Sequence, residues 1–323
     1  MTPTLAITFD TELIWGSVDH VTPAEFERRY PDVRGAIAGI MRLLQTYEIS
    51  ATWAVVGHLF LARCREDASG SAHPAIVMPA RGSAAERWFR ADPCTSRERD
   101  PLFYGDDLLD LLTASRTAQE IGCHSFVHAP YDDPAMTAEV VRSDLAECKR
   151  AAARRGIELT SFVFPRNREA HHDSLRAEGF TAYRGADPTW HASIGGPAGR
   201  LAHLIDQGMA IPPPVSTPRQ ILPGLWNIPG SMLLLHNSGF RGAVPLRARV
   251  AKAKAGLRRA VREGAVFHLW THPFNVASDA PFMLEALERI LREAALMRDR
   301  EELLVEPMRS IAKRSRQEGI RAT

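Results

Sequence analysis

The 323-residue sequence predicts an α/β fold in which a parallel sheet curls into a (β/α) barrel. Short apolar runs of strand length alternate along the chain with longer segments of helical periodicity, which is the pattern of a parallel sheet or barrel. Seven such runs can be counted, one fewer than the eight strands of a complete barrel. Two long segments interrupt this alternation, and each follows a predicted strand.

The predicted strands are short runs dominated by apolar, β-branched and aromatic residues. Most are bounded by polar residues, glycine or proline, which favour turns. In chain order the predicted strands are 5–9, 51–56, 120–123, 161–164, 181–184, 225–228 and 266–270.

Between the strands, apolar residues recur at intervals of three and four, which places them on one face of a helix. In the first of these segments Ile37, Ile40 and Leu44 share that face. The predicted helices are 34–47, 137–155, 246–263 and 282–298.

One interrupting segment, residues 62–105, is rich in proline, glycine, serine and arginine. The other, residues 186–224, includes Gly195-Gly196-Pro197 and Pro212-Pro213-Pro214. Loops this long within a compact domain are usually functional or disordered. Both are expected to leave the carboxyl ends of strands, where barrel enzymes build their sites. We therefore expect them to shape a pocket and to govern which substrate enters it.

Composition sets bounds on the class of protein. The hydrophobic share of 45% and the charged share of 24% are ordinary for a soluble globular protein. A net charge of +2 is too small to indicate a nucleic-acid partner. The sequence shows neither a signal peptide nor an apolar run of the ~18 residues that a membrane span needs, so we expect a cytoplasmic protein without a transmembrane segment. The four cysteines form no Cys-x-x-Cys pair and are expected to be reduced, with an isolated disulfide left open.

Polar residues follow the first and third predicted strands. Asp10 and Glu12 extend the first strand, and residues two apart on an extended chain point the same way. His124 and His128 follow the third strand, and their spacing of four residues brings both imidazoles to one side. Neutral imidazole is the commonest protein ligand of catalytic transition metals, and such a site needs one further ligand. The pattern indicates a metal centre.

Polar residues also follow the fourth strand and the last. The fourth ends in Pro165-Arg166, and the last leads through Trp270 to His272. Four separate strands thus deliver polar groups to the same predicted end of a barrel. That coincidence indicates an active site at this end.

Taken in order, these motifs resemble those of the polysaccharide deacetylases, carbohydrate esterase family 4, which share a homology domain with the nodulation-type chitooligosaccharide deacetylases. The motifs are Thr-Phe-Asp-x-Glu, His-Ser-x-x-His, Phe-Pro-Arg and Leu-Trp-Thr-His-Pro, spread from residue 5 to about 275. The resemblance implies a distorted (β/α)7, TIM-like barrel. It implies a single domain over 1–323 that carries the two insertions, and metal-dependent hydrolysis of N-acetyl groups on amino sugars.

The resemblance also implies roles for the motif residues. Asp10 would be the general base, His124 and His128 metal ligands, and His272 the general acid. The commonest opening motif has adjacent aspartates, the second of which binds the metal, whereas Thr11 stands there in this chain.

Two of the motifs depart from the family pattern, and their residues are assigned roles from their places in the chain. We expect Glu12, whose carboxylate serves zinc as well as aspartate does, to be the third ligand. The usual third motif sets arginine before proline, whereas here Arg166 follows Pro165. We still expect Arg166 to hold Asp10 ionised.

Three further residues are expected at the substrate. Trp190 and Trp270 are candidates because aromatic rings stack on sugar faces, and Leu269 opens the closing motif beside Trp270. His268 is expected to point inward as a supporting or core residue. His171 and His172 are expected at the surface, at the start of a helix.

Zinc is the expected metal, with Fe²⁺, Co²⁺ and Ni²⁺ left open by a ligand set of two histidines and a carboxylate. The expected substrate is an N-acetylated amino sugar, as a cytoplasmic glycan or sugar-nucleotide intermediate of surface polysaccharide synthesis. Three alternatives stay open. They are a metal-free ureide or formamide hydrolase on the same barrel, a non-haem iron oxygenase, and a sugar-binding module without catalysis. The oligomeric state is not predicted.

Overall fold

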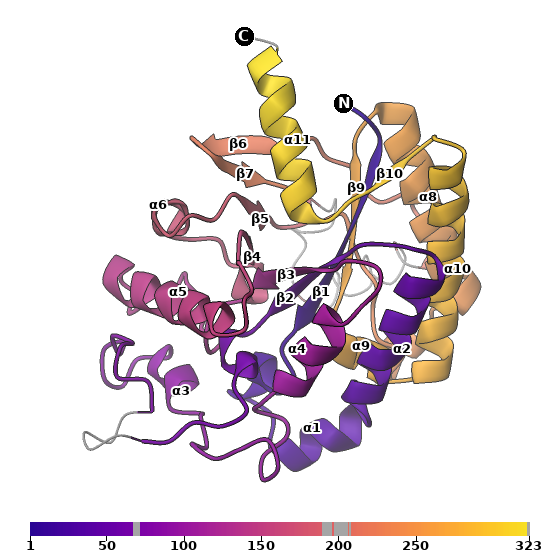
Figure 1. The fold of residues 1–323 in the computed structure, drawn as a ribbon. Helices are drawn as coiled ribbons and strands as arrows, with labels where there is room; N and C mark the ends of the chain where they lie inside the picture. The colour runs from indigo at the N-terminus through magenta and orange to yellow at the C-terminus, as the bar shows by residue number, and fades with distance from the viewer. Residues whose placement is uncertain (67–71, 189–195, 197–205, 207, 322–323) are drawn as a thin grey trace.

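The computed structural model describes residues 1–66, 72–188, 196, 206 and 208–321 (Figure 1). Its strands form one curled, largely parallel sheet with helices packed outside it, so the predicted barrel is confirmed as a half-barrel. The spatial order is β6-β7-β5-β4-β3-β2-β1-β9-β8, and β10 pairs with one end of β1. The hydrogen-bonded path ends at β6 and β8, which accounts for the distortion of the barrel.

All seven predicted strands are present, each within two residues of its predicted bounds. They are β1 (Thr4–Thr11), β2 (Thr52–Val55), β3 (Glu120–Cys123), β4 (Ser161–Val163), β5 (Ala182–Arg184), β7 (Leu225–Asn227) and β9 (Val266–Thr271). Each pairs in parallel with its neighbours of this set.

Among the described residues, three short strands were not predicted. They are β6 (Arg219–Leu222), β8 (Met232–Leu233) and β10 (Leu304–Val305). Two of them have two residues each, too few for any periodicity, and β6 is an exposed antiparallel edge strand.

The four predicted helices are confirmed and form the outer layer. They are α2 (Val33–Thr46), α5 (Ala138–Ala153), α8 (Leu246–Glu263) and α10 (Ala280–Asp299). Asp32 caps α2 by accepting a hydrogen bond from the Gly35 amide at 2.8 Å, and Ile37, Ile40 and Leu44 are buried on its inner face, as predicted. Figure 1 shows α2, α8 and α10 along one side of the sheet and α5 along the other.

The remaining helices are shorter or lie outside the alternating pattern. They are α1 (Pro23–Arg29), α3 (Glu86–Phe89), α4 (Asp106–Thr113), α6 (His172–Ala177), α9 (Pro273–Ala277), α11 (Met308–Arg321) and the 3₁₀ turns η1 (Trp15–Ser17), η2 (Gly57–Phe60), η3 (Pro165–Asn167) and η4 (Gly239–Ala243). None of the described helices has the length and the apolar composition that crossing a bilayer requires.

Helix α11 fills the amino end of the half-barrel. Its residues Met308 and Ile311 pack against Ala6 and Ala54, small residues that point inward from the central strands. The buried carboxylate of Glu120 accepts hydrogen bonds at the start of α11 and from two neighbouring strands. Its donors are the Arg309 amide (3.1 Å), the Thr52 hydroxyl (2.7 Å) and the Ser161 hydroxyl (2.5 Å). These hydrogen bonds fasten the start of α11 to the sheet.

Both insertions leave the carboxyl ends of strands, as predicted, the first after β2 and the second after β5. The first is closed by an antiparallel bridge between Arg63 and Ser96 and contains α3. The second contains β6, and most of 189–207 lies outside the described residues. With the amino end filled by α11, the carboxyl edge of the sheet is where a cavity can form.

Candidate metal and active centre

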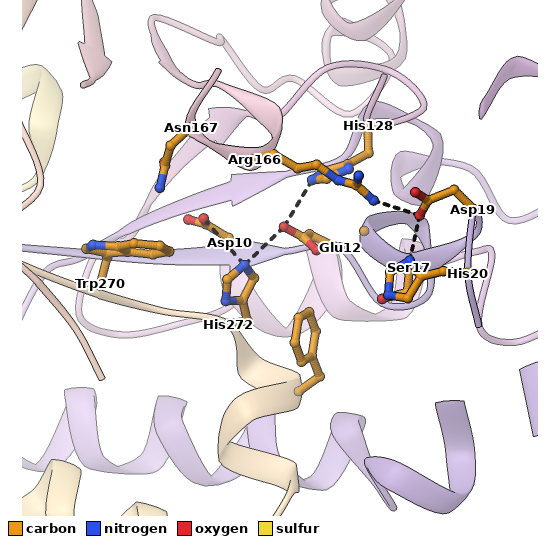
Figure 2. Close-up of a pocket in the computed structure, with 12 residues that line it drawn as sticks. Asp10, Glu12, Ser17, Asp19, His20, His128, Arg166, Asn167, Trp270 and His272 are labelled. Atoms are coloured by element: carbon orange, nitrogen blue, oxygen red, sulfur yellow. Dashed lines mark hydrogen bonds and ion pairs between the residues drawn. The ribbon is translucent and has the colours of Figure 1, made fainter. Parts of the chain in front are cut away.

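A cavity of about 620 Å³ opens at the carboxyl edge of the sheet (Figure 2). Strands β1 and β9 and the loops that follow β3 and β4 supply its polar wall. The residues lining it include Asp10, Glu12, His128, Arg166, Trp270 and His272.

The three predicted metal ligands lie together and are buried. Glu12 Oε1 is 3.0 Å from His124 Nε2 and 3.1 Å from His128 Nε2. The histidines do not lie on a helix: they follow β3 in a tight loop in which Ser125 and His128 have left-handed backbone angles, φ 63° and 65°. This loop, rather than a helical turn, brings the two imidazoles to one side.

The hydrogen bonding of His124 fits a metal ligand. Its Nδ1 lies 2.7 Å from the carbonyl oxygen of Val163, which can only accept, so Nδ1 carries the proton. In the neutral ring Nε2 then presents a lone pair to the Glu12 carboxylate. Two acceptors at 3.0 Å repel each other unless a proton or a cation lies between them. A histidine that donates its other N–H to a backbone carbonyl is the usual arrangement behind a metal.

The charge states of the cluster also suit a cation. Burial on its own would raise the pKa of Glu12, but the neighbouring His128 and His272 outweigh it and hold that pKa well below its usual range. Burial lowers the pKa of His128, although Glu12 opposes this effect. The ionised carboxylate is the form that binds a metal, and a proton that His128 carries beside Glu12 would be released when a metal binds. Asp10, Glu12 and His272 form a second set close enough to share an ion, with Glu12 common to both.

Asp10 is held by an arginine that the sequence analysis did not single out. Arg184, at the end of β5, donates from Nη1 to Oδ1 and from Nη2 to Oδ2 of Asp10, each at 2.6 Å. Arg184 also donates to the Thr8 hydroxyl at 2.8 Å and to Asn167 Oδ1 at 3.0 Å. Burial alone would raise the pKa of Asp10, but Arg184 outweighs it and lowers the value. Asp10 is therefore a fixed, ionised carboxylate.

Arg166 does not take the role predicted for it, because Arg184 holds Asp10. Arg166 lies in the 3₁₀ turn η3 with a left-handed φ of 57°. Its guanidinium pairs with Asp19 at 2.6 Å and covers the ring of Trp88 at 4.9 Å. The prediction failed because this turn directs the side chain to the outer rim of the cavity, where Figure 2 shows it beside Asp19.

His272 faces the cavity from the end of β9. Its Nε2 lies 3.3 Å from Glu12 Oε1 and 3.8 Å from Asp10 Oδ2, and its ring stacks on Phe274 with centroids 4.6 Å apart. Burial would lower the pKa of His272, but Glu12 and then Asp10 outweigh it and raise the pKa. The side chain is therefore able to carry a proton into the cavity.

Of the residues predicted to contact the substrate, Trp270 lines the cavity and Leu269 does not. Trp270 lines the cavity, donates its indole N–H to Asp187 at 2.9 Å and stacks over the Arg184 guanidinium at 4.1 Å. Leu269 was predicted wrongly: strand alternation turns it to the opposite face, where it is 1% exposed in the main core. His268 points inward, as expected, and is buried, with Nδ1 3.1 Å from the Ile228 carbonyl.

Two other predictions concern Trp190 and His172. Trp190 lies outside the described residues. His172 begins α6, as expected, and its Nε2 is 3.3 Å from Glu169 Oε2.

Comparisons with known proteins bear on the fold. The sequence matches no protein-family model and no curated protein. The structure resembles a protein from Mycobacterium smegmatis described as a polysaccharide deacetylase, with TM-score 0.61 and 15% identity over 99% of this chain and 92% of that one. It also resembles a protein from Pseudomonas aeruginosa PAO1 described in the same way, with TM-score 0.57 and 12% identity over 96% and 89% of the two chains.

A third similar structure has a different activity. The 4-alpha-glucanotransferase of Thermococcus litoralis matches with TM-score 0.51 and 11% identity, over 97% of this chain and 40% of that one. The chain thus has the fold of the polysaccharide deacetylases, and part of a protein with a different activity shares this fold. Activity has to be inferred from the site itself.

Proposed function

We propose that this protein is a metal-dependent N-deacetylase that hydrolyses the N-acetyl group of an amino sugar. The observation that carries the proposal is the pairing, in one cavity, of an ionised carboxylate with a cluster of metal-binding groups. Arg184 donates hydrogen bonds to both carboxylate oxygens of Asp10. Oε1 of Glu12 lies within 3.1 Å of Nε2 of both His124 and His128. Amide hydrolysis needs a base for water and an electrophile for the carbonyl, and these two features supply them.

Glu12, His124 and His128 would hold the metal. A divalent ion bound there lowers the pKa of bound water and polarises the amide carbonyl. Zinc is the first choice, and iron, cobalt and nickel also suit two histidines and a carboxylate.

The protein's own groups move the protons. Asp10, kept anionic by Arg184, accepts a proton from the attacking water at a carboxylate oxygen. His272 donates its Nε2 proton to the nitrogen of the departing amine. The C–O bond to water forms first, and the C–N bond then breaks as the carbonyl re-forms and the amine takes the proton from His272. The products are acetate and the free amino sugar.

The cavity suits a small molecule or the end of a glycan. A volume of about 620 Å³ lies within the usual range of ligand sites. One face of the Trp270 ring is covered by Arg184, so a sugar could meet only its edge or the opposite face. We further propose a cytoplasmic glycan or sugar-nucleotide intermediate of surface polysaccharide synthesis as the substrate.

Glycosyl transfer on the same fold is a weaker match to this site. Hydrolysis or transfer at a glycosidic bond normally uses two carboxylates that flank the bond. Here Glu12 is surrounded by His124, His128 and His272, and Asp10 has both oxygens bonded to Arg184. The arrangement favours one base beside one metal.

The test combines elemental analysis with an assay of amine release from a panel of N-acetylated sugars and sugar nucleotides. We expect release of free amine that is abolished by a chelator and restored by a divalent ion. Hydrolysis of ureides or formamides by the metal-stripped protein, with none of the acetylated sugars cleaved, would favour the metal-free alternative instead.

A further inference from the structure

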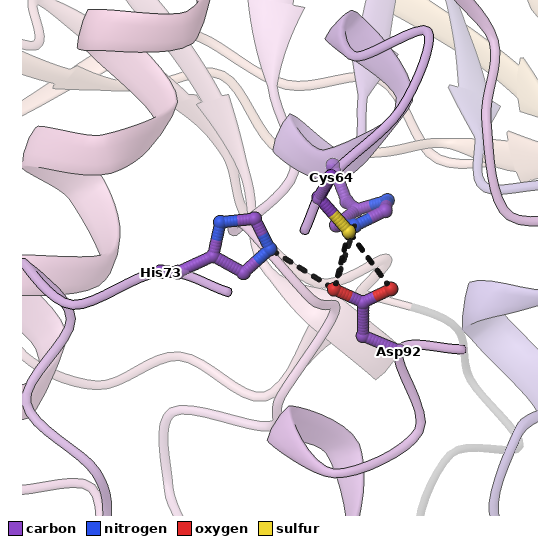
Figure 3. A group of neighbouring side chains, drawn as sticks. Cys64, His73 and Asp92 are labelled. Atoms are coloured by element: carbon purple, nitrogen blue, oxygen red, sulfur yellow. Dashed lines mark hydrogen bonds and ion pairs between the residues drawn. The ribbon is translucent and has the colours of Figure 1, made fainter. Parts of the chain in front are cut away.

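A second cluster of metal-binding side chains lies at the 62–105 insertion, outside the cavity described above. One candidate ligand atom from each of its four residues lies within 4.8 Å of every other. Figure 3 shows three of the side chains turned toward a common point. We call this group the insertion cluster: His58, Cys64, His73 and Asp92.

The separations in the insertion cluster are close to those of a tetrahedral zinc site. His58 Nε2 and His73 Nε2 lie 3.1 and 3.0 Å from the same oxygen, Asp92 Oδ2. Cys64 Sγ lies 3.1 Å from that oxygen and 3.7 Å from His58 Nε2. Zinc bonded at ~2.0 Å to nitrogen or oxygen and ~2.3 Å to sulfur holds tetrahedral ligand atoms roughly 3.3–3.7 Å apart. An ion would need only small shifts of these side chains.

The hydrogen bonding of His58 repeats the pattern seen at His124. The Nδ1 atom of His58 lies 2.9 Å from the carbonyl oxygen of Phe103, so Nδ1 carries the proton. In the neutral ring the Nε2 lone pair faces the Asp92 carboxylate at 3.1 Å, and the His58 side chain is fully buried. A cation between the two acceptors removes their repulsion and needs no buried imidazolium. The Cys94 amide donates to the other Asp92 oxygen, Oδ1, at 2.9 Å and leaves Oδ2 for an ion.

We propose that the insertion cluster is a second metal site, which binds one divalent ion of the zinc class. A thiolate, two imidazoles and a carboxylate fill a tetrahedral shell and leave no position for water, which is the mark of a structural site. On binding, the metal–sulfur bond replaces the S–H bond of Cys64, and the proton leaves to solvent. A cavity of about 310 Å³ borders His73 and Asp92 and gives the ion a path to the site.

The ion would fix the insertion to the barrel. His58 lies in η2, directly after β2, whereas the other three ligands come from the insertion itself. The insertion also carries Trp88, whose ring lies 5.3 Å from that of His128 and 4.9 Å from the Arg166 guanidinium. A metal at the insertion cluster would therefore hold Trp88 against two residues that line the catalytic cavity, His128 and Arg166, without entering the reaction.

Cobalt substitution separates the two sites, since only the insertion cluster contains sulfur. We expect the full-length protein loaded with Co²⁺ to show a thiolate-to-cobalt charge-transfer band. Cys64→Ser should abolish the band and remove one ion per chain in elemental analysis. Cys94→Ser, the matched control in the same loop, should keep both. His124→Ala should lose the other ion and keep the band, so failure of the proposed function is distinguishable from failure of this proposal.

Three results would overturn the assignment. They are a cobalt-loaded wild-type protein without the band, a band that persists in Cys64→Ser, and a band that disappears in Cys94→Ser instead. The presence or absence of the band in the cobalt-loaded wild-type protein tests the proposal even if Cys64→Ser does not fold. Limited proteolysis tests the anchoring: chelator-treated protein should be cleaved within 62–105 faster than the metal-loaded protein. Equal cleavage rates would show that the ion does not hold the insertion.

Discussion

Arg184 and Asp10 meet across the interior of the half-barrel, with both guanidinium-to-carboxylate contacts at 2.6 Å. They belong to β5 and β1, and β4, β3 and β2 lie between these strands in the sheet. Strands about 4.8 Å apart would place the same positions roughly 19 Å apart in a flat sheet. The pair therefore exists only because the sheet curls, and it links the curl of the sheet to the charge state of the proposed base.

Replacing Arg184 should impair Asp10 as a general base and leave the metal content of the active centre unchanged. In Arg184→Met the Asp10 carboxyl is left buried without its cation, so its pKa should rise and its capacity as a base should fall. We expect the turnover number to drop about 10²–10⁴-fold, the usual worth of a general base, with metal content unchanged. Arg166→Met is the control, because Arg166 pairs with Asp19. An equal loss of turnover in both variants would contradict the assignment of Arg184.

Asp10→Asn tests the base directly. The amide keeps the shape of the side chain but cannot accept the proton of water as a carboxylate does. We expect a similar loss of about 10²–10⁴-fold in turnover, with metal and fold retained. Asp19→Asn makes the same change in the same cavity and should cost far less. Wild-type turnover of Asp10→Asn at neutral pH would show that another group is the base.

Replacing any one of the three proposed metal ligands should weaken binding of the catalytic ion. His124→Ala and His128→Ala are each expected to lose the catalytic ion and nearly all activity while the circular dichroism spectrum stays native. Glu12→Ala should weaken metal binding more than Thr11→Ala does, because only Glu12 faces the two histidines. Metal titration followed by elemental analysis measures this order, and the reverse order would move the third ligand to Thr11.

Glu120 gives the stability of the protein a defined pH dependence. Burial raises the pKa of this carboxyl in the folded state, so the folded chain binds its proton more tightly than the unfolded chain. Stability of the wild type should therefore fall as the pH rises from the unfolded value of ~4.3 through the higher folded value. Glu120→Gln keeps an acceptor for Thr52 and Arg309 and has no proton to lose.

The urea midpoint of both proteins across the acid range tests this prediction. We expect the stability of Glu120→Gln relative to the wild type to increase with pH and then level off. A difference that does not change with pH, or that changes with the opposite sign, would show that Glu120 is not the group responsible.

The sequence predicted the strands and the clustering at one edge because both depend on local rules. An apolar run marks each strand, and polar residues directly after it must lie at its carboxyl end. That rule brought Asp10, Glu12, His124, His128 and His272 into one group, and the structure places them together. Applied to the strand 181–184, the same rule would have included Arg184 as well.

Other features depend on information that no local pattern contains. Which arginine reaches Asp10 is set by the curl of the whole sheet and by the left-handed turn at Arg166. The insertion cluster has irregular spacing along the chain, at positions 58, 64, 73 and 92, which matches no metal-binding motif. Its convergence follows from the path of a loop with little regular structure. Leu269 was misplaced because a motif identifies a segment, whereas strand alternation decides which side chains face the cavity.

The position of β1 in the sheet has a consequence for biosynthesis. This strand precedes every other described strand in the chain, yet it lies between β2 and β9, and its residue Thr4 pairs with Val266. During translation one edge of an apolar central strand therefore stays unpaired until most of the chain has left the ribosome. Contacts this distant in sequence slow folding, and an open strand edge invites association with other chains. A polypeptide that ends before β9 lacks the partner that covers this edge of β1, so the edge stays open to association with other chains.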